Sequence, residues 1–193
     1  MQNQDRPYGS QGFSGIDEQG WYQAARRVVS PHFDARPDEE DVSLLVVHNI
    51  SLPPAQFGGP YIEDFFLGQL DASSHPFFKV IEKMKVSAHC LIRRDGEVVQ
   101  FVPFSARAWH AGVSSFAGRA RCNDYSIGIE LEGTDYVAYT NAQYASLQRL
   151  TQSLMARYPQ ITRERITGHQ YIAPLRKSDP GLVFDWSRFK NTL

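Results

Sequence analysis

Runs of apolar residues predict short strands in the first two thirds of the chain. Leu44–Val47 is a continuous apolar run with β-branched residues, and it predicts a strand that is buried on both faces. Residues 88–93 and 97–102 surround Asp95-Gly96, a pair that tolerates the positive φ angles of a tight turn, and they predict a β-hairpin. Ser126–Leu131 alternates apolar residues with small or polar ones and predicts a further strand.

A helical pattern dominates the last third of the chain. The strongest helix is predicted over 141–158, where apolar residues recur at spacings of three and four: Tyr144, Leu147, Leu150, Leu154 and Tyr158. Thr140 and Gln143 form a capping-box pattern at its start, and Pro159 ends it. Shorter helices are predicted at 62–70 and 186–192. Because strands and helices are mixed without strict alternation, we expect an α/β fold with a mixed β-sheet flanked by helices.

Length and composition indicate a single folded unit. The chain has 193 residues, of which 42% are hydrophobic and 21% are charged, as in an ordinary globular domain. The first twenty residues are polar and show no periodic pattern. We therefore expect residues 1–20 to be a flexible polar lead-in and residues 21–193 to be a single domain.

Charge and cysteine content narrow the partners and the compartment. Lys plus Arg number 20 and Asp plus Glu number 21, so no excess charge favours nucleic acid or an anionic membrane. Cys90 and Cys122 are too few for a disulfide scaffold and are interpreted as reduced thiols. The chain has no apolar run of membrane-spanning length, and residues 1–20 lack the apolar core of a secretory signal. We expect a cytoplasmic monomer without nucleic-acid or membrane partners.

Two histidines and an aspartate are candidates for a metal site. His48 follows the predicted apolar strand, and His169 and Asp179 lie ten residues apart on a Pro/Gly-rich loop, 167–181. Two imidazoles and one carboxylate are a suitable ligand set for a catalytic Zn²⁺, which keeps its fourth position for water. The alternative is that the histidines are ordinary hydrogen-bonded residues, that 179–181 is a plain turn and that Lys177 is an exposed charge.

Glu130 and Glu132 are candidates for a catalytic carboxylate. Both lie on the same face of the predicted strand at 126–131 and its extension, because side chains alternate along a strand. A buried carboxylate with a raised pKa would suit a general base beside a metal-activated water. The alternative is that both side chains face solvent, and position alone does not distinguish the two glutamates.

Five motifs occur together and in order along the chain. They are HNIS at 48–51, SAHCLIRRDG at 87–96, AWHAG at 108–112, NDYSIGIELEG at 123–133, and TGH, IAP and RKSDPG within 167–181. With them, residues 21–190 resemble the zinc-dependent N-acetylmuramoyl-L-alanine amidase family. The resemblance implies a mixed β-sheet flanked by helices, shared with peptidoglycan recognition proteins. It also implies cleavage of the amide between (1,6-anhydro)-N-acetylmuramic acid and L-alanine of the stem peptide, in cell-wall recycling.

The resemblance also implies roles for individual residues. His48, His169 and Asp179 match the family's ligands for one zinc ion per chain. Glu130 matches its catalytic acid/base, and Lys177 matches the cation that stabilises the oxyanion. The resemblance, and not the strand pattern, selects Glu130 over Glu132.

Four residues are candidates for contacting an anhydro-muropeptide substrate. Trp109 is expected to stack on a sugar face, with a core tryptophan as the alternative. Arg121 and Lys85 are candidates for holding a stem-peptide carboxylate, since the resembling family uses basic residues near these positions; the alternative is that both are exposed charges without a ligand role. Asn49 follows the candidate metal ligand His48. Three further histidines are interpreted as hydrogen-bonded packing residues, with a place in the lining of the cleft as the alternative: His75, His89 and His110.

Two other functions are consistent with the same motifs. One is a non-catalytic muropeptide-binding protein of the peptidoglycan-recognition type, and the other is an amidase that acts on intact peptidoglycan outside the cytoplasm. Such binding proteins typically lack part of the metal set. Because the complete set is present in this chain, the enzymatic function is favoured.

Overall fold

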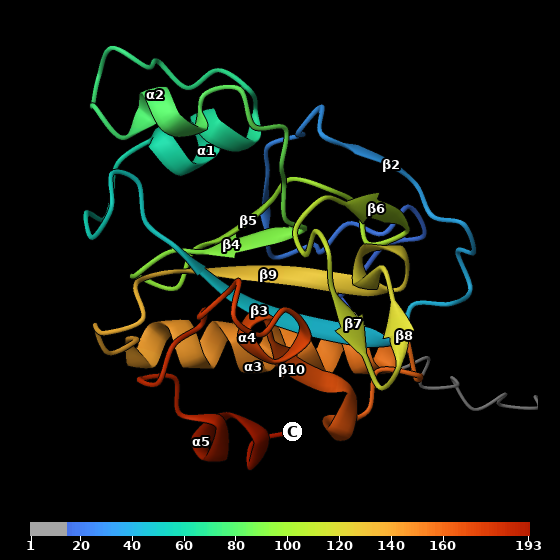
Figure 1. Cartoon of the computed structure of the whole chain (residues 1–193). Coiled ribbons are helices and arrows are strands. Elements are labelled where there is room, and N and C mark those ends of the chain that lie inside the picture. The colour runs from blue at the N-terminus through green and yellow to red at the C-terminus, as the bar shows by residue number, and fades with distance from the viewer. Residues whose placement is uncertain (1–14) are drawn as a thin grey trace, which may run out of the picture.

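The computed structural model describes residues 15–193 and is built on a six-stranded mixed sheet (Figure 1). The strand order is β1 (Arg26–Arg27), β5 (Val98–Gln100), β4 (Cys90–Ile92), β9 (Ser126–Glu132), β3 (Leu44–Ile50) and β10 (Ile166–Gly168). Strands β4, β9, β3 and β10 are parallel, whereas β4 and β5 form an antiparallel hairpin. The predicted mixed sheet and hairpin are confirmed, and Gly96 in the turn has a φ of 91°.

Short elements surround this sheet. Two small antiparallel pairs are β2 (Phe33–Ala35) with β6 (Ala106–Ala108), and β7 (Ser115–Phe116) with β8 (Arg119–Ala120). The helices are α1 (Tyr61–Phe66), α2 (Phe78–Ile81), α3 (Asn141–Arg157), α4 (His169–Ile172) and α5 (Trp186–Lys190), with 3₁₀ turns η1 (Cys122–Asp124) and η2 (Arg163–Arg165). The predicted short helices are therefore present, but each ends earlier than its sequence pattern suggests.

Helix α3 starts where its sequence predicts and ends one residue earlier, at Arg157. The Thr140 hydroxyl accepts the backbone N–H of Gln143, and the Gln143 side chain accepts the backbone N–H of Thr140, which completes the capping box. The Gln143 amide also donates to the carbonyl oxygens of Ile92 and Glu132. This helix start is therefore bonded to the ends of two central strands, so α3 is fixed along one face of the sheet.

The two faces of the central strands have different roles. Leu45 and Val47 of β3 pack with Ile127 and Ile129 of β9 in the core that contains α3. Because side chains alternate, the intervening positions of both strands point to the opposite face. Helices α1 and α2 lie on that side, away from α3 (Figure 1). His48 and Glu130 belong to this second face and lie directly opposite each other in the strand register.

Most of the expected lead-in, residues 1–14, lies outside the described residues. Residues 15–20 are described, and among them Ile16 is buried in the core that contains α3 and bridges to Tyr22. The domain boundary at residue 20 stays a prediction. No helix among the described residues combines the length and the apolar character of a membrane span.

Candidate active site

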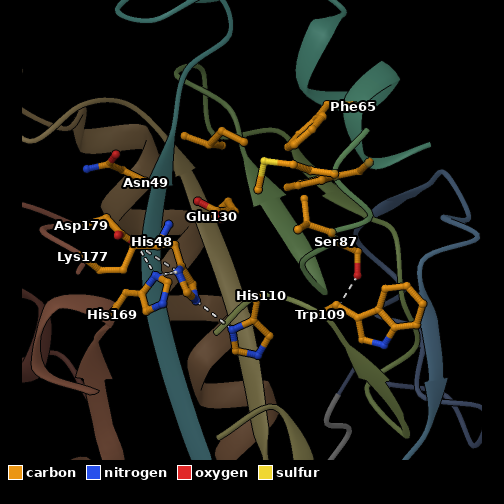
Figure 2. Close-up of a pocket in the computed structure, with 14 residues that line it drawn as sticks. His48, Asn49, Phe65, Ser87, Trp109, His110, Glu130, His169, Lys177 and Asp179 are labelled. Atoms are coloured by element: carbon orange, nitrogen blue, oxygen red, sulfur yellow. Dashed lines mark hydrogen bonds and ion pairs between the residues drawn. The ribbon is translucent and has the colours of Figure 1, made fainter. Parts of the chain in front are cut away.

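The three predicted metal ligands converge where neighbouring parallel strands end (Figure 2). His48 lies on β3, His169 is the first residue of α4 directly after β10, and Asp179 lies on the loop that follows α4. The Nδ1 atoms of the two histidines are 3.0 Å apart, and each is 3.0 Å from Oδ2 of Asp179. The structure thus brings together residues that are up to 131 positions apart in the chain.

The outer nitrogens of both histidines have partners that determine where the protons lie. His169 Nε2 is 3.1 Å from the carbonyl oxygen of Ala111, which only accepts, so Nε2 carries the proton. His48 Nε2 is 2.9 Å from Nδ1 of His110, whose own Nε2 is 3.1 Å from the hydroxyl oxygen of Ser126. A proton on each Nε2 satisfies this chain of hydrogen bonds. Both inner Nδ1 atoms then present lone pairs.

The resulting cluster fits a divalent cation. Two nitrogen lone pairs and a carboxylate oxygen face one another at 3.0 Å, with no proton available between them. Such acceptors repel one another unless a positive charge lies between them. All three side chains are largely buried: the exposed fractions of the His48, His169 and Asp179 side chains are 1%, 2% and 14%. Two imidazoles and a carboxylate are also the donor types that catalytic metal sites use.

The electrostatics of the cluster keep its ligands in the metal-binding protonation states. Burial lowers the pKa of His48 to about 4, so this imidazole is neutral at neutral pH. Burial alone would raise the pKa of Asp179, but its 3.0 Å contacts with His169 and His48 outweigh burial and hold that pKa well below its usual range. A neutral imidazole and an ionised carboxylate are the forms that bind a metal.

The segment that carries Asp179 is held by its backbone. The expectation that 167–181 is a loop throughout is wrong for its first part, because β10 continues to Gly168 and His169–Ile172 forms α4. A backbone hydrogen bond connects α4 to the segment that carries Asp179: the N–H of Gln170 donates to the carbonyl oxygen of Asp179 at 2.9 Å. The local sequence does not reveal this contact. The hydroxyl of Tyr139 donates to the next carbonyl, that of Pro180, at 2.7 Å.

Glu130 and Glu132 are both buried but differ in their partners. The solvent-facing alternative is wrong for both, since they are exposed by 9% and 1%. Glu132 accepts backbone N–H groups of Gly58 at 2.6 Å and Arg94 at 3.0 Å, which is a structural role. Glu130 lines the pocket beside His48, and its Oε2 is buried with no hydrogen-bond partner among the described residues. Burial and the nearby Asp179 raise the pKa of Glu130 well above its usual value.

The pocket beside the cluster has one polar and one apolar side. Lys177 lines the polar side with Glu130 and the three candidate ligands. Figure 2 shows Phe65 across the pocket from these groups. The apolar side, which the sequence did not reveal as part of a site, consists of Ile50, Phe65, Phe66, Met84 and Val86. A substrate with a polar reacting bond and an apolar or ring-shaped body suits such a pocket.

Trp109 and Asn49 also line the pocket, and both are held by carboxylates. The indole Nε1 of Trp109 donates to Oδ1 of Asp34 at 3.1 Å, and its backbone N–H donates to Oγ of Ser87 at 3.1 Å. The Asn49 amide donates to Asp135 at 2.8 Å. These contacts orient both side chains before any ligand binds, and their role in binding stays a prediction.

Lys85 and Arg121 lie outside the pocket lining. Lys85 is exposed between Met84 and Val86, which do line it. Arg121 is 73% exposed at the side chain and forms an ion pair of 2.9 Å with Asp124. For these two residues a contact with substrate remains a prediction that the pocket itself does not support.

The three further histidines singled out from the sequence differ in their surroundings. His89 is fully buried, accepts the N–H of Gly128 at 3.0 Å and donates to the carbonyl of Ala106 at 3.1 Å, as expected of a packing residue. His75 is an intermediate-exposure residue that accepts the N–H of Phe77. His110 lines the pocket and contacts His48, so the packing interpretation is incomplete for this residue.

Comparisons with known proteins point to one family. The family model described as N-acetylmuramoyl-L-alanine amidase matches residues 38–182. The chain is 63% identical over 173 residues to 1,6-anhydro-N-acetylmuramyl-L-alanine amidase AmpD of Citrobacter freundii, which covers 90% of this chain and 92% of that protein.

Solved structures agree with the sequence relatives. The crystal structure of a selenomethionine AmpD derivative superposes with a TM-score of 0.89 at 62% identity, covering 92% of this chain and 98% of the other. AmpDh3 of Pseudomonas aeruginosa, solved in complex with anhydromuramic pentapeptide, superposes with a TM-score of 0.56 at 28% identity, covering 92% of this chain and 65% of the other.

Proposed function

Because this chain belongs to the N-acetylmuramoyl-L-alanine amidase family, we propose that it is a zinc hydrolase of peptidoglycan recycling. Its substrate is the amide between 1,6-anhydro-N-acetylmuramic acid and the L-alanine of a stem peptide. The proposal rests mainly on the buried His48–His169–Asp179 cluster, whose three acceptor atoms are mutually 3.0 Å apart. Beside it lies Glu130, whose Oε2 has no hydrogen-bond partner among the described residues. A packing role alone does not account for three converging acceptors.

Zinc is the metal that best suits this ligand set. Two histidine nitrogens and one carboxylate form a typical three-residue catalytic zinc site, whereas magnesium and calcium prefer oxygen ligands. When bound, zinc acts as a Lewis acid that lowers the pKa of water and polarises a carbonyl group. The residues His48, His169 and Asp179 hold the ion, and the neighbouring side chains carry out the proton transfers.

Glu130 is the proposed general base and acid. Its raised pKa and unpartnered Oε2 suit a carboxyl group that takes up a proton and releases it again in one cycle. It accepts the proton of the attacking water and returns that proton to the alanine nitrogen as the amide bond breaks. Lys177, on the same side of the pocket, offsets the negative charge that develops on the carbonyl oxygen.

The two sides of the pocket suit the two parts of the substrate. The amide must lie against the polar side, and the apolar residues of α1 and of the segment around Met84 are then available to the sugar ring and the lactyl methyl group. Asp34 fixes the Trp109 indole, one face of which stacks on His32, and we assign the pocket side of this ring to a sugar ring of the substrate. The name of the Citrobacter freundii relative supports a 1,6-anhydro sugar. We place the reaction in the cytoplasm, in keeping with two separate buried thiols, Cys90 and Cys122.

The test is an assay of peptide release. Zinc-loaded protein is incubated with anhydro-muropeptide, and free stem peptide is measured by mass spectrometry, with intact sacculi in a parallel arm. We expect release from the anhydro-muropeptide, loss of release on chelation and recovery on addition of zinc. Binding of the muropeptide without release by fully loaded protein would instead support the non-catalytic binding protein and overturn the proposal. Faster release from sacculi would overturn the assigned substrate alone.

A further inference from the structure

We propose that His110 and Ala111 form an outer shell that orients both metal-binding histidines, and that Asn123 positions this dipeptide. The inference rests on the proposed metal site and concerns residues that do not themselves hold the ion. His48 lies on β3 and His169 is the first residue of α4, yet their outer nitrogens contact two consecutive residues. His48 Nε2 is 2.9 Å from the His110 side chain, and His169 Nε2 is 3.1 Å from the Ala111 carbonyl.

The fold makes room for the His110 ring. A Cβ atom on Gly128 of β9 would lie 2.4 Å from Cγ of His110, so only glycine permits the ring to lie against this strand. On its far side, Nε2 of His110 is 3.1 Å from the hydroxyl oxygen of Ser126, on the same strand. The ring is thus held between β9 and His48, with Nδ1 directed at the metal ligand. Packing alone would not require a nitrogen at both of these positions.

The backbone of the dipeptide is held by one side chain. Oδ1 of Asn123 accepts the N–H of His110 at 3.2 Å and the N–H of Ala111 at 2.8 Å. Asn123 lies in η1, which leads directly into β9. The Ala111 carbonyl also accepts from Nη2 of Arg176 at 2.7 Å, which connects it to the segment that carries Asp179.

These contacts determine ring orientation and tautomer, the two properties on which metal binding by histidine depends. Hydrogen bonds to the outer nitrogen hold the ring in place and keep the lone pair on the inner nitrogen, and loss of such a partner typically weakens metal affinity about 10- to 100-fold. Loss of the His110 acceptor affects His48 alone. Loss of the Asn123 oxygen frees the dipeptide and therefore affects both histidines.

The test uses two matched pairs of variants in the full chain. His110→Leu removes the atom that accepts the hydrogen bond from His48. His110→Asn keeps an acceptor, because the Oδ1 atom of asparagine is bonded to Cγ, as Nδ1 is in histidine. Asn123→Ala removes the oxygen that holds the dipeptide, whereas Asn123→Asp retains one. His75→Leu is the control for a histidine without a link to the site. Zinc affinity is measured by competition with a chromogenic chelator, and thermal unfolding of each metal-free protein is recorded separately.

We expect His110→Leu and Asn123→Ala to bind zinc about 10- to 100-fold more weakly than wild type, with His110→Asn and Asn123→Asp closer to wild type. A merely structural role would lower the melting temperature of the metal-free protein and leave zinc affinity unchanged, which would overturn the inference. If His110→Leu does not fold, the Asn123 pair decides. Wild-type protein that binds no zinc would overturn the proposed function together with this inference, whereas wild-type binding with unaffected variants would overturn the inference alone.

Discussion

Replacing Glu130 by glutamine tests the assignment of the proton-transferring group. The substitution preserves the shape of a side chain that is only 9% exposed, but it removes the ability to take up and release a proton. General acid–base catalysis typically contributes about 10²- to 10⁴-fold, which corresponds to about 3–5 kcal/mol of transition-state stabilisation. Because Oε2 has no hydrogen-bond partner among the described residues, the change breaks no internal contact of that oxygen. We therefore expect kcat of Glu130→Gln to fall by about 10²- to 10⁴-fold, with zinc content unchanged.

Glu132→Gln is the matched control on the same face of β9. Glu132 uses both carboxylate oxygens to accept the N–H groups of Gly58 and Arg94, and glutamine retains only one acceptor. Loss of one buried acceptor leaves an N–H unsatisfied and costs about 1–3 kcal/mol of stability. We expect this variant to unfold at lower denaturant concentration while its kcat stays within about threefold of wild type, well short of the loss expected for an acid–base residue.

The assay measures initial rates of stem-peptide release from anhydro-muropeptide by mass spectrometry, with zinc content determined on the same samples. Denaturant unfolding of each variant is followed in parallel. A zinc-loaded Glu130→Gln protein with the kcat of wild type would refute the assignment. An equal loss of activity in Glu130→Gln and Glu132→Gln would also refute the assignment, because it would give Glu130 no role that Glu132 lacks.

Three further predictions concern the surrounding residues. Lys177→Met should lower kcat by about 10²- to 10³-fold with zinc retained, as loss of one oxyanion-stabilising group does; unchanged kcat would exclude that role. Removing zinc by chelation should lower the melting temperature, because a ligand that binds only the folded state stabilises it, and Asp179→Asn should abolish this zinc-dependent difference. Hydrogen bonds from Arg26 and Arg93 lower the pKa of Glu63 on α1 to about 2. Its stabilisation is therefore complete above the unfolded-state pKa near 4.5 and is lost as pH falls toward 2. After allowance for screening at the exposed Arg26, this stabilisation amounts to about 1–2 kcal/mol at neutral pH. The free energy of unfolding of wild type should exceed that of Glu63→Gln by this amount at neutral pH, and the difference should disappear as the pH falls toward 2.

The strand faces were predictable from the sequence, but the pairing between strands was not. Alternation alone places His48 on the face opposite Leu45 and Val47, and it places Glu130 with Glu132. Which residues lie side by side depends on the register between β3 and β9, which are 82 positions apart at His48 and Glu130. The tertiary contacts of Glu132 distinguish it from Glu130, since Glu132 accepts the N–H groups of Gly58 and Arg94 and forms an ion pair of 3.6 Å with Arg93.

Other parts of the site had no usable local signal. Strands of two or three residues, such as β1 and β10, are too short to show a period. The apolar residues of α1 were predicted as part of a helix, but their position across from the metal cluster depends on how α1 packs on the sheet. His110 belongs to a motif that the sequence singles out, yet its hydrogen bond to His48 appears only when β9 brings Gly128 and Ser126 beneath its ring.

The most direct test of the central claim is X-ray anomalous scattering from crystals of the purified protein, recorded on both sides of the zinc absorption edge. The account predicts one zinc peak per chain, at about 2.0–2.2 Å from His48 Nδ1, His169 Nδ1 and an oxygen of Asp179. A metal bound elsewhere, or a fully occupied zinc that lacks any one of these three ligands, would contradict it.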